Sequence, residues 1–138
     1  MNVVIRPAEA RDLSFLHEHD HHIALTELDR LIRAGRILLL EKDGEPCGWL
    51  RWSLFWDNTP FMNLLYLLEG SREQGLGRAL VHRFEEDMQS AGYPLVLTST
   101  QADEYAQHFY RHLGYRDAGC FTLPGESCEL LLAKELKS

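Results

Sequence analysis

A strand–loop–helix pattern between residues 60 and 92 constrains the fold of this chain more than any other feature. It opens with the nearly continuous apolar run PFMNLLYLLEG, which is typical of a strand buried on both faces. A short loop then leads to Gly75 and Gly77. After it, apolar residues recur every four positions, as in an amphipathic helix, at Leu76, Leu80, Phe84 and Met88. A buried strand that leads into a helix in this way predicts a crossover unit, with the helix packed back onto a sheet.

The same pattern occurs a second time, in the apolar run at residues 93–100 and the helical pattern at residues 103–114. We therefore expect local parallel pairing between the two buried strands. The remaining elements are a strand at 2–7, helices at 13–19 and 24–35, a hairpin around Asp43-Gly44 and a final antiparallel pair around Pro124-Gly125. This order predicts an α/β (α+β) fold, a mixed sheet with helices packed on it.

The composition is that of an ordinary globular protein, and we expect a single domain spanning residues 1–138. Of these 138 residues, 45% are hydrophobic and 25% are charged. No apolar stretch approaches the roughly 20 residues of a membrane span, and the N-terminal segment lacks a signal-peptide pattern. We therefore expect a cytoplasmic protein with no membrane partner. The formal net charge of −7 disfavours nucleic acid and favours a cationic small molecule or peptide as partner.

Two groups of metal-binding residue types occur, and we predict no metal site in either. The segment HEHDHH would place His17 and His21 on one face if it were helical, but a polar helix end is the alternative. The cysteines Cys47, Cys120 and Cys128 have no metal-type spacing. In a reducing compartment they are expected to be free thiols. Cys120 and Cys128 could face each other across the final hairpin, although no disulfide is predicted.

Gly75 and Gly77 need an explanation, because glycine weakens the helix that they introduce. The first turn of a helix carries unpaired N–H groups and the positive end of the helix dipole, so it can hold a phosphate. Glycine lets the anion approach the backbone, and Arg72 and Arg78 add positive charge. The loop therefore predicts a phosphate or pyrophosphate site, although a tight turn alone would also explain two glycines. Neither a P-loop lysine nor a third dinucleotide-type glycine follows.

Two motifs in this order resemble the GNAT superfamily of acetyl-CoA-dependent N-acetyltransferases. REQGLGRAL, at residues 72–80, is similar to the Gln/Arg-x-x-Gly-x-Gly/Ala signature of that family. DEYAQHFYRHLGY, at residues 103–115, is similar to its Asn-x-x-Ala-x-x-Phe-Tyr-x-x-x-Gly-Phe stretch. The resemblance, together with VIRPAEARDLSFL near the start, covers nearly the whole chain. It implies a mostly antiparallel sheet of about six to seven strands, splayed between strands 4 and 5, with about four flanking helices.

The resemblance also implies how acetyl-CoA is bound. The glycine loop of the family holds the pyrophosphate through main-chain N–H groups, and an exposed edge of the preceding strand pairs with pantetheine. Carried over to this sequence, the pyrophosphate residues are Arg72, Glu73, Gln74, Gly75, Leu76, Gly77 and Arg78, and the pantetheine residues are Leu65, Tyr66 and Leu67. Asp103 stands where the family usually has asparagine, so it would make a cofactor contact without an amide N–H, or it could cap the helix.

For catalysis, the resemblance assigns Tyr110 as the acid that protonates the departing thiolate, with a core aromatic as the alternative. Some relatives carry a glutamate base where this chain has Thr98, which cannot act as a base. We take Glu69 as its substitute, although it could be a solvated loop carboxylate, and Asp57 as a second candidate. His21 or His22 could also contact substrate or serve as base.

The acceptor is expected near the tryptophan-rich strand. Strand alternation places Trp49 and Arg51 on one face and Trp52 on the other, and Trp49 is expected in the core. The predicted acceptor residues, chosen for a cationic or aromatic amine, are Trp52, Trp56, Asp57 and His22.

The function predicted from the sequence is direct transfer of the acetyl group from acetyl-CoA to a primary amine of a small molecule or peptide. One alternative is a GNAT-fold module that binds acetyl-CoA without transferring it, and another is a different phosphate-ligand enzyme. A homodimer through the final strands is also expected.

Overall fold

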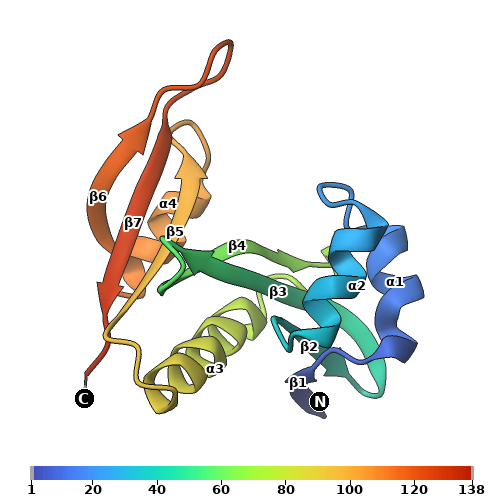
Figure 1. The fold of residues 1–138 in the computed structure, drawn as a ribbon. Coiled ribbons are helices and arrows are strands. Elements are labelled where there is room, and N and C mark those ends of the chain that lie inside the picture. The colour runs from blue at the N-terminus through green and yellow to red at the C-terminus, as the bar shows by residue number, and fades with distance from the viewer. Residues whose placement is uncertain (1, 138) are drawn as a thin grey trace. The chain divides into compact units, whose positions relative to one another are not determined.

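The computed structural model describes residues 2–137, which form one seven-stranded sheet with four α-helices and two 3₁₀ turns (Figure 1). The strands are β1 (Val3–Pro7), β2 (Ile37–Lys42), β3 (Glu45–Phe55), β4 (Thr59–Leu67), β5 (Leu95–Gln101), β6 (Arg116–Phe121) and β7 (Glu129–Glu135). The helices are α1 (Leu13–His19), α2 (Leu25–Arg33), α3 (Leu76–Ser90) and α4 (Ala106–His112), and the 3₁₀ turns are η1 (Ala10–Asp12) and η2 (Glu69–Ser71).

The strand order is β1-β2-β3-β4-β5-β7-β6. Pairing is antiparallel between β1 and β2, β2 and β3, β5 and β7, and β6 and β7, and it is parallel between β4 and β5. The predicted mixed, mostly antiparallel sheet with four helices is therefore confirmed, including the parallel contact between the two buried strands. The parallel register joins Phe61 to Leu97 and Met62 to Thr98. Splaying of these strands beyond Met62 stays a prediction.

The chain divides into two compact units, which are described separately. The first contains Met1–Trp52 and Leu64–Phe84, and the second contains Ser53–Asn63 and Glu85–Ser138. The division runs through β3, β4 and α3, so each unit holds part of these elements.

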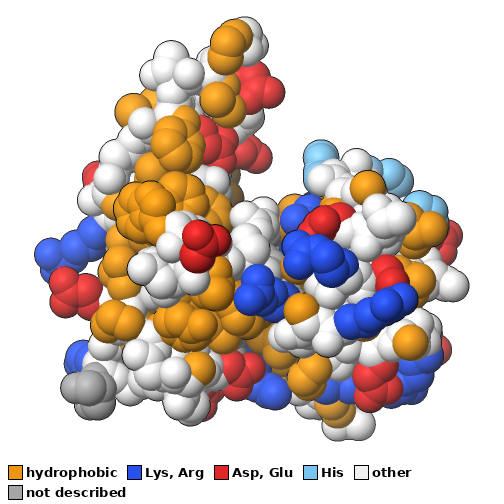
Figure 2. Space-filling model, in the orientation of Figure 1, with side chains coloured by type: hydrophobic (Ala, Val, Ile, Leu, Met, Phe, Trp, Pro, Cys, Tyr) orange, Lys and Arg blue, Asp and Glu red, His pale blue; other side chains and the backbone are white. Residues whose placement is uncertain are grey.

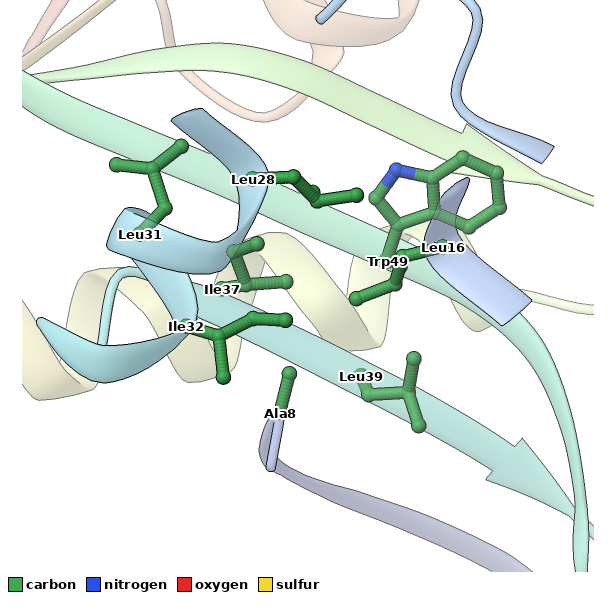
Figure 3. Close-up of a cluster of buried hydrophobic side chains, with 8 residues drawn as sticks. All are labelled: Ala8, Leu16, Leu28, Leu31, Ile32, Ile37, Leu39 and Trp49. Atoms are coloured by element: carbon green, nitrogen blue, oxygen red, sulfur yellow. The ribbon is translucent and has the colours of Figure 1, made fainter. Parts of the chain in front are cut away.

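In the first unit, α1 and α2 cover one face of β2 and β3. The apolar positions of α2 recur at helical spacing, so Leu28, Leu31 and Ile32 are all buried. Figure 3 shows this core cluster, which consists of Ala8, Leu16, Leu28, Leu31, Ile32, Ile37, Leu39 and Trp49. Trp49 is completely buried there, as its strand position predicts.

The opposite face of the same strands meets the start of α3. Strand alternation turns Gly48 and Trp52 away from Trp49, and the Trp52 ring lies 5.9 Å from the Phe84 ring of α3. A Cβ atom at Gly48 would stand 2.5 Å from Leu67 Cδ2 and 3.1 Å from the Tyr66 carbonyl oxygen. Glycine at this position therefore allows β3 and β4 to approach each other closely.

Two turns place non-glycine residues in the left-handed region. Asp43 and Gly44 have φ of 53° and 85°, as expected for the predicted β2–β3 hairpin. The β3–β4 connection uses Trp56 and Asp57 in the same way, with φ of 56° and 63°. This conformation is unfavourable for a bulky residue such as tryptophan, although the following residues Asp57, Asn58 and Pro60 are typical of a turn.

In the second unit, β5 and β7 turn alternate residues toward a buried face. Val96, Thr98 and Leu132 are almost completely inaccessible there, and Thr98 pairs with Leu132 in the ladder. A polar cluster lies beside this core, because Glu85 accepts hydrogen bonds from the Tyr115 hydroxyl and Lys134 Nζ, both at 2.9 Å. Figure 2 shows hydrophobic side chains gathered on the visible face of β5, β6 and β7.

Candidate functional site

The loop between β4 and α3 presents a row of unpaired main-chain N–H groups. Ser71 and Arg72 still donate within the turn, to Leu68 and Glu69 at 2.9 and 3.4 Å, and Ala79 makes the first helical bond, to Gly75 at 3.1 Å. For residues 73–78, which lie between them, no main-chain N–H has an acceptor among the residues that the structure describes. A helix N-terminus preceded by such a loop is an anion site, because several N–H dipoles converge on one place.

Backbone conformation explains how these N–H groups become free. Glu73 and Gly75 both adopt the left-handed region, with φ of 62° and 76°. Alternating conformations of this kind turn successive N–H groups toward the same side, which forms a nest for an anion. No atom lies within 4 Å of the Cβ that Gly75 lacks, so its φ angle, and not a lack of space, requires glycine there.

Side chains of the loop are occupied in holding its shape. Arg72 Nε donates to the Leu67 carbonyl oxygen at 3.1 Å, and its guanidinium lies 5.3 Å from the Tyr66 ring centroid. Gln74 accepts from Lys42 Nζ at 3.2 Å. The loop therefore offers its backbone to a ligand, while the Arg72 side chain is engaged with β4. Arg78 is exposed on the first turn of α3, and Gly77 beside it is buried.

Tyr110 is buried in the second unit, where Thr98 is its polar neighbour. Its side chain is 6% exposed. Thr98 Oγ1 donates its own proton to the Met62 carbonyl oxygen at 3.0 Å. Burial raises the pKa of Tyr110 to about 12, although the neighbouring Thr98 hydroxyl acts in the opposite direction. The phenol is therefore protonated at neutral pH, as a proton donor must be.

A small pocket in the first unit lies at the α1–α2 loop. It has a volume of about 100 Å³ and is lined by His19, Asp20, His21, His22, Trp49, Leu64 and Tyr66. Figure 2 shows the histidine side chains gathered around this loop. The predicted acceptor residue His22 and the alternative His21 both belong to it.

Asp20 forms the floor of this pocket and was not predicted from the sequence. Its carboxylate is completely buried and accepts from Arg51 Nε at 2.8 Å and from Trp49 Nε1 at 3.1 Å. Arg51 Nη2 and the His22 main-chain N–H also donate to it. Burial acts to raise the pKa of Asp20, but these bonds and the Arg51 charge outweigh it and lower the pKa. An arginine beside Trp49 on an otherwise apolar strand face was the available signal for this pair.

Of the other predicted site residues in the first unit, Tyr66 lines this pocket and Trp52 does not. Trp52 lies on the opposite face of β3 from Trp49, where the Arg36 guanidinium stands 5.2 Å from its ring. Trp56 and Asp57 belong to the second unit, and Trp56 is 71% exposed. Glu69 is exposed in η2, directly before the glycine loop. Of the pantetheine residues, Leu65 and Leu67 are half-buried and Tyr66 is exposed.

Asp103 has a partner other than the helix that it was expected to cap. Its Oδ1 accepts from Ser127 Oγ at 2.9 Å, and Tyr105 occupies the cap position of α4. Its assignment as a cofactor contact stays a prediction.

Within residues 2–137, no group of three or more histidine, cysteine, aspartate or glutamate side chains could hold a metal ion. No helix among these residues is long and apolar enough to cross a membrane.

Comparisons with known proteins connect this geometry to a family. A comparison with curated proteins gave no match. Among solved structures, Ard1 from Thermoplasma volcanium is 16% identical with a TM-score of 0.86, and the match covers 100% of both chains. The ribosomal-protein-S18-alanine N-acetyltransferase from Escherichia coli is 17% identical with a TM-score of 0.83, covering 99% of this chain and 96% of that one. YncA from Salmonella typhimurium, solved with its cofactor acetyl-CoA, is 16% identical with a TM-score of 0.82, covering 100% and 96%.

These identities show a shared fold. The family model described as Acetyltransferase (GNAT) family matches residues 4–115, which is most of the chain and includes both motifs. The chain therefore belongs to the GNAT family of acetyltransferases.

Proposed function

We propose that this protein transfers the acetyl group of acetyl-CoA directly to a primary amine of a small molecule or peptide. The observation that carries the proposal is the row of free N–H groups at residues 73–78, directly after a buried strand. A pyrophosphate supplies the anion that such a nest holds. The structural neighbour YncA was solved with acetyl-CoA, and a neighbouring N-acetylglutamate synthase from Neisseria gonorrhoeae was solved with coenzyme A.

In this proposal, residues 72–78 hold the pyrophosphate through the backbone. The Arg72 side chain helps to hold the loop in place, because it donates to the Leu67 carbonyl oxygen and lies against the Tyr66 ring. Arg78 is exposed beside the nest and adds positive charge. The main chain of Leu65, Tyr66 and Leu67 pairs with pantetheine as an added strand would.

The chemical step forms one bond and breaks another. The neutral amine attacks the carbonyl carbon of the thioester, the carbon–sulfur bond breaks, and the sulfur takes a proton from Tyr110. Tyr110 is suited to this role because burial raises its pKa and keeps it protonated at neutral pH. Glu69 is the proposed base that takes the proton of the amine, with Asp57 as the second candidate; both are exposed carboxylates.

The proposed acceptor residues are His22, Trp52, Trp56 and Asp57. Of these, His22 has direct structural support, because it lines the pocket above Asp20. A cytoplasmic location and a homodimer through β6 and β7 are further proposals.

Cofactor binding is tested by calorimetry with coenzyme A. The variant Gly77→Asp, which adds a carboxylate inside the nest, is expected to abolish binding. Gly70→Asp is the matched control, because no atom lies within 4 Å of its missing Cβ, and it is expected to bind normally. Since Gly77 is buried, Arg78→Glu provides an exposed second variant, expected to weaken binding about tenfold. Normal binding by folded Gly77→Asp and Arg78→Glu proteins would contradict the assignment.

Catalysis is tested by release of the coenzyme A thiol with a panel of amines. Tyr110→Phe is expected to lower kcat by about 10²- to 10⁴-fold while leaving coenzyme A affinity unchanged. An alternative function, an acyl-CoA-binding module, is favoured by Thr98 standing where some relatives have a glutamate base. Tight binding of acetyl-CoA without thiol release for any amine would support that module and refute the enzyme.

A further inference from the structure

Two cysteines lie near the loop end of the β6–β7 hairpin. Cys120 is in β6 opposite Leu130, and Cys128 comes directly before β7. Positions two residues apart on a strand share a face, so the register turns both thiols to the same side of the hairpin. The two thiols are close enough to interact electrostatically. We propose that Cys120 and Cys128 form a reversible dithiol–disulfide pair that low-molecular-weight disulfides, such as glutathione disulfide, oxidise.

Accessibility separates these two thiols from the third. Cys120 is exposed and Cys128 is half-buried, whereas Cys47 is only 6% exposed in the first unit. The neighbouring Cys120 thiol raises the pKa of Cys128 above its ordinary value. Cys128 therefore stays protonated longer, and the more exposed Cys120 is the thiol that reacts first.

The reaction balances with glutathione disulfide as the oxidant. The Cys120 thiolate attacks one sulfur of glutathione disulfide and displaces one glutathione thiolate. Cys128 then loses its proton and attacks the Cys120 sulfur, which displaces the second glutathione. Two protein thiols become one disulfide, and the oxidant takes up two electrons and two protons to give two glutathione molecules.

The position of the pair connects it to the segment that precedes α4. The Cys128 carbonyl oxygen accepts from the Ala102 main-chain N–H at 2.7 Å. Next to it, Ser127 Oγ donates to Asp103 at 2.9 Å. Both partners lie between β5 and α4, the helix that carries Tyr110. A disulfide at Cys128 would restrain the part of the hairpin that holds this segment. The oxidation state of the pair is therefore expected to change hydrogen exchange at the Ala102 amide.

The test is a glutathione titration in which the protein is quenched with acid and weighed by mass spectrometry. An intramolecular disulfide makes the protein lighter by two hydrogen atoms, and its ratio to the dithiol depends on [GSSG]/[GSH]². Tenfold dilution of total glutathione at a constant ratio of its two forms is therefore expected to raise the disulfide-to-dithiol ratio tenfold. The ratio of a mixed disulfide to the free thiol depends on [GSSG]/[GSH], so dilution at a constant ratio of the two forms would leave it unchanged.

Variants identify the residues. Cys120→Ser and Cys128→Ser are expected to give only glutathionyl adducts, and Cys47→Ala, the control, is expected to behave as the wild type. Hydrogen exchange at the Ala102 amide is expected to slow in the oxidised protein. The proposal is overturned if the wild type gives only covalent dimers, or only glutathionyl adducts whose amount does not change on dilution. It is also overturned if Cys47→Ala removes the increase in disulfide on dilution. Unchanged exchange at Ala102 would overturn the link to the β5–α4 segment.

Discussion

Removal of the Asp20 carboxylate tests how the α1–α2 loop is held. In the wild type this carboxylate has no exposed surface and accepts hydrogen bonds from Arg51, Trp49 and the His22 main chain. Asp20→Ala leaves the guanidinium of Arg51, which is itself 8% exposed, without a counter-ion. The Trp49 indole N–H also loses its acceptor. The variant therefore leaves two buried donors unsatisfied in one place.

The expected cost follows from those two donors. Breaking a buried ion pair from one side costs about 3 to 5 kcal/mol, and an unsatisfied buried N–H costs about 1 to 3 kcal/mol. Because the two groups share one cavity that water can enter, the terms overlap, and we expect about 4 kcal/mol in total. At about 3 °C per kcal/mol for a chain of this size, the midpoint of thermal unfolding falls by about 12 °C.

Urea and thermal unfolding measure this loss. Asp20→Ala/Arg51→Met, which removes both charges, is expected to recover at least half of the lost stability, because no buried charge is left unpaired. Arg11→Ala is the matched control for an ion pair: its pair with Glu9 is exposed on both sides, and its loss is expected to cost less than about 0.5 kcal/mol. A loss below about 1 kcal/mol in Asp20→Ala, or a double variant no more stable than the single, would refute the reasoning.

Three further outcomes are expected. Gly48→Ala places a Cβ 3.1 Å from the Tyr66 carbonyl oxygen and should destabilise the protein by about 1 to 3 kcal/mol in urea, whereas Gly70→Ala should be nearly neutral. Tyr115→Phe removes the bond to Glu85 and should cost about 1 to 2 kcal/mol, with equal stability counting against the cluster. The pKa of Asp20 in the folded protein lies below its unfolded value of about 3.9. The stabilisation from Asp20 should therefore be complete above that pH and be lost as the pH falls through the folded pKa. On acid titration, the free energy of unfolding of Asp20→Ala/Arg51→Met should decline less steeply than that of the wild type.

The elements that the sequence predicted are those in which one periodicity dominates. The helix of α3 follows from apolar residues at four-residue spacing, and the β2–β3 hairpin follows from Asp43-Gly44, whose left-handed angles a tight turn requires. The left-handed turn before α3 was predictable for a similar reason, because glycine before a helix is a local backbone signal. At the β3–β4 turn, Asp57 and Asn58 are turn-forming residues, but Trp56 gives no local signal for its left-handed angle.

Contacts between distant segments could not be predicted in this way. Asp20 and Arg51 are 31 residues apart, and only the packing of α1 against β3 brings them together. The same holds for Thr98, which donates to the Met62 carbonyl oxygen and is the polar neighbour of Tyr110. A sequence motif pointed to Tyr110 on α4, but its neighbour Thr98 lies on β5, at a position where the family comparison indicated only a missing glutamate.

The hydrogen bond of Thr98 helps to explain which side chain is proposed as the base. A threonine hydroxyl has one proton, and in this structure it is donated to the Met62 carbonyl oxygen. A glutamate in its place would put a carboxylate beside the phenol and raise the pKa of Tyr110 further, because like charges would result from ionising both. A threonine hydroxyl cannot take up the proton of the amine at neutral pH. This is why the exposed carboxylate of Glu69, and not a residue of β5, is proposed as the base.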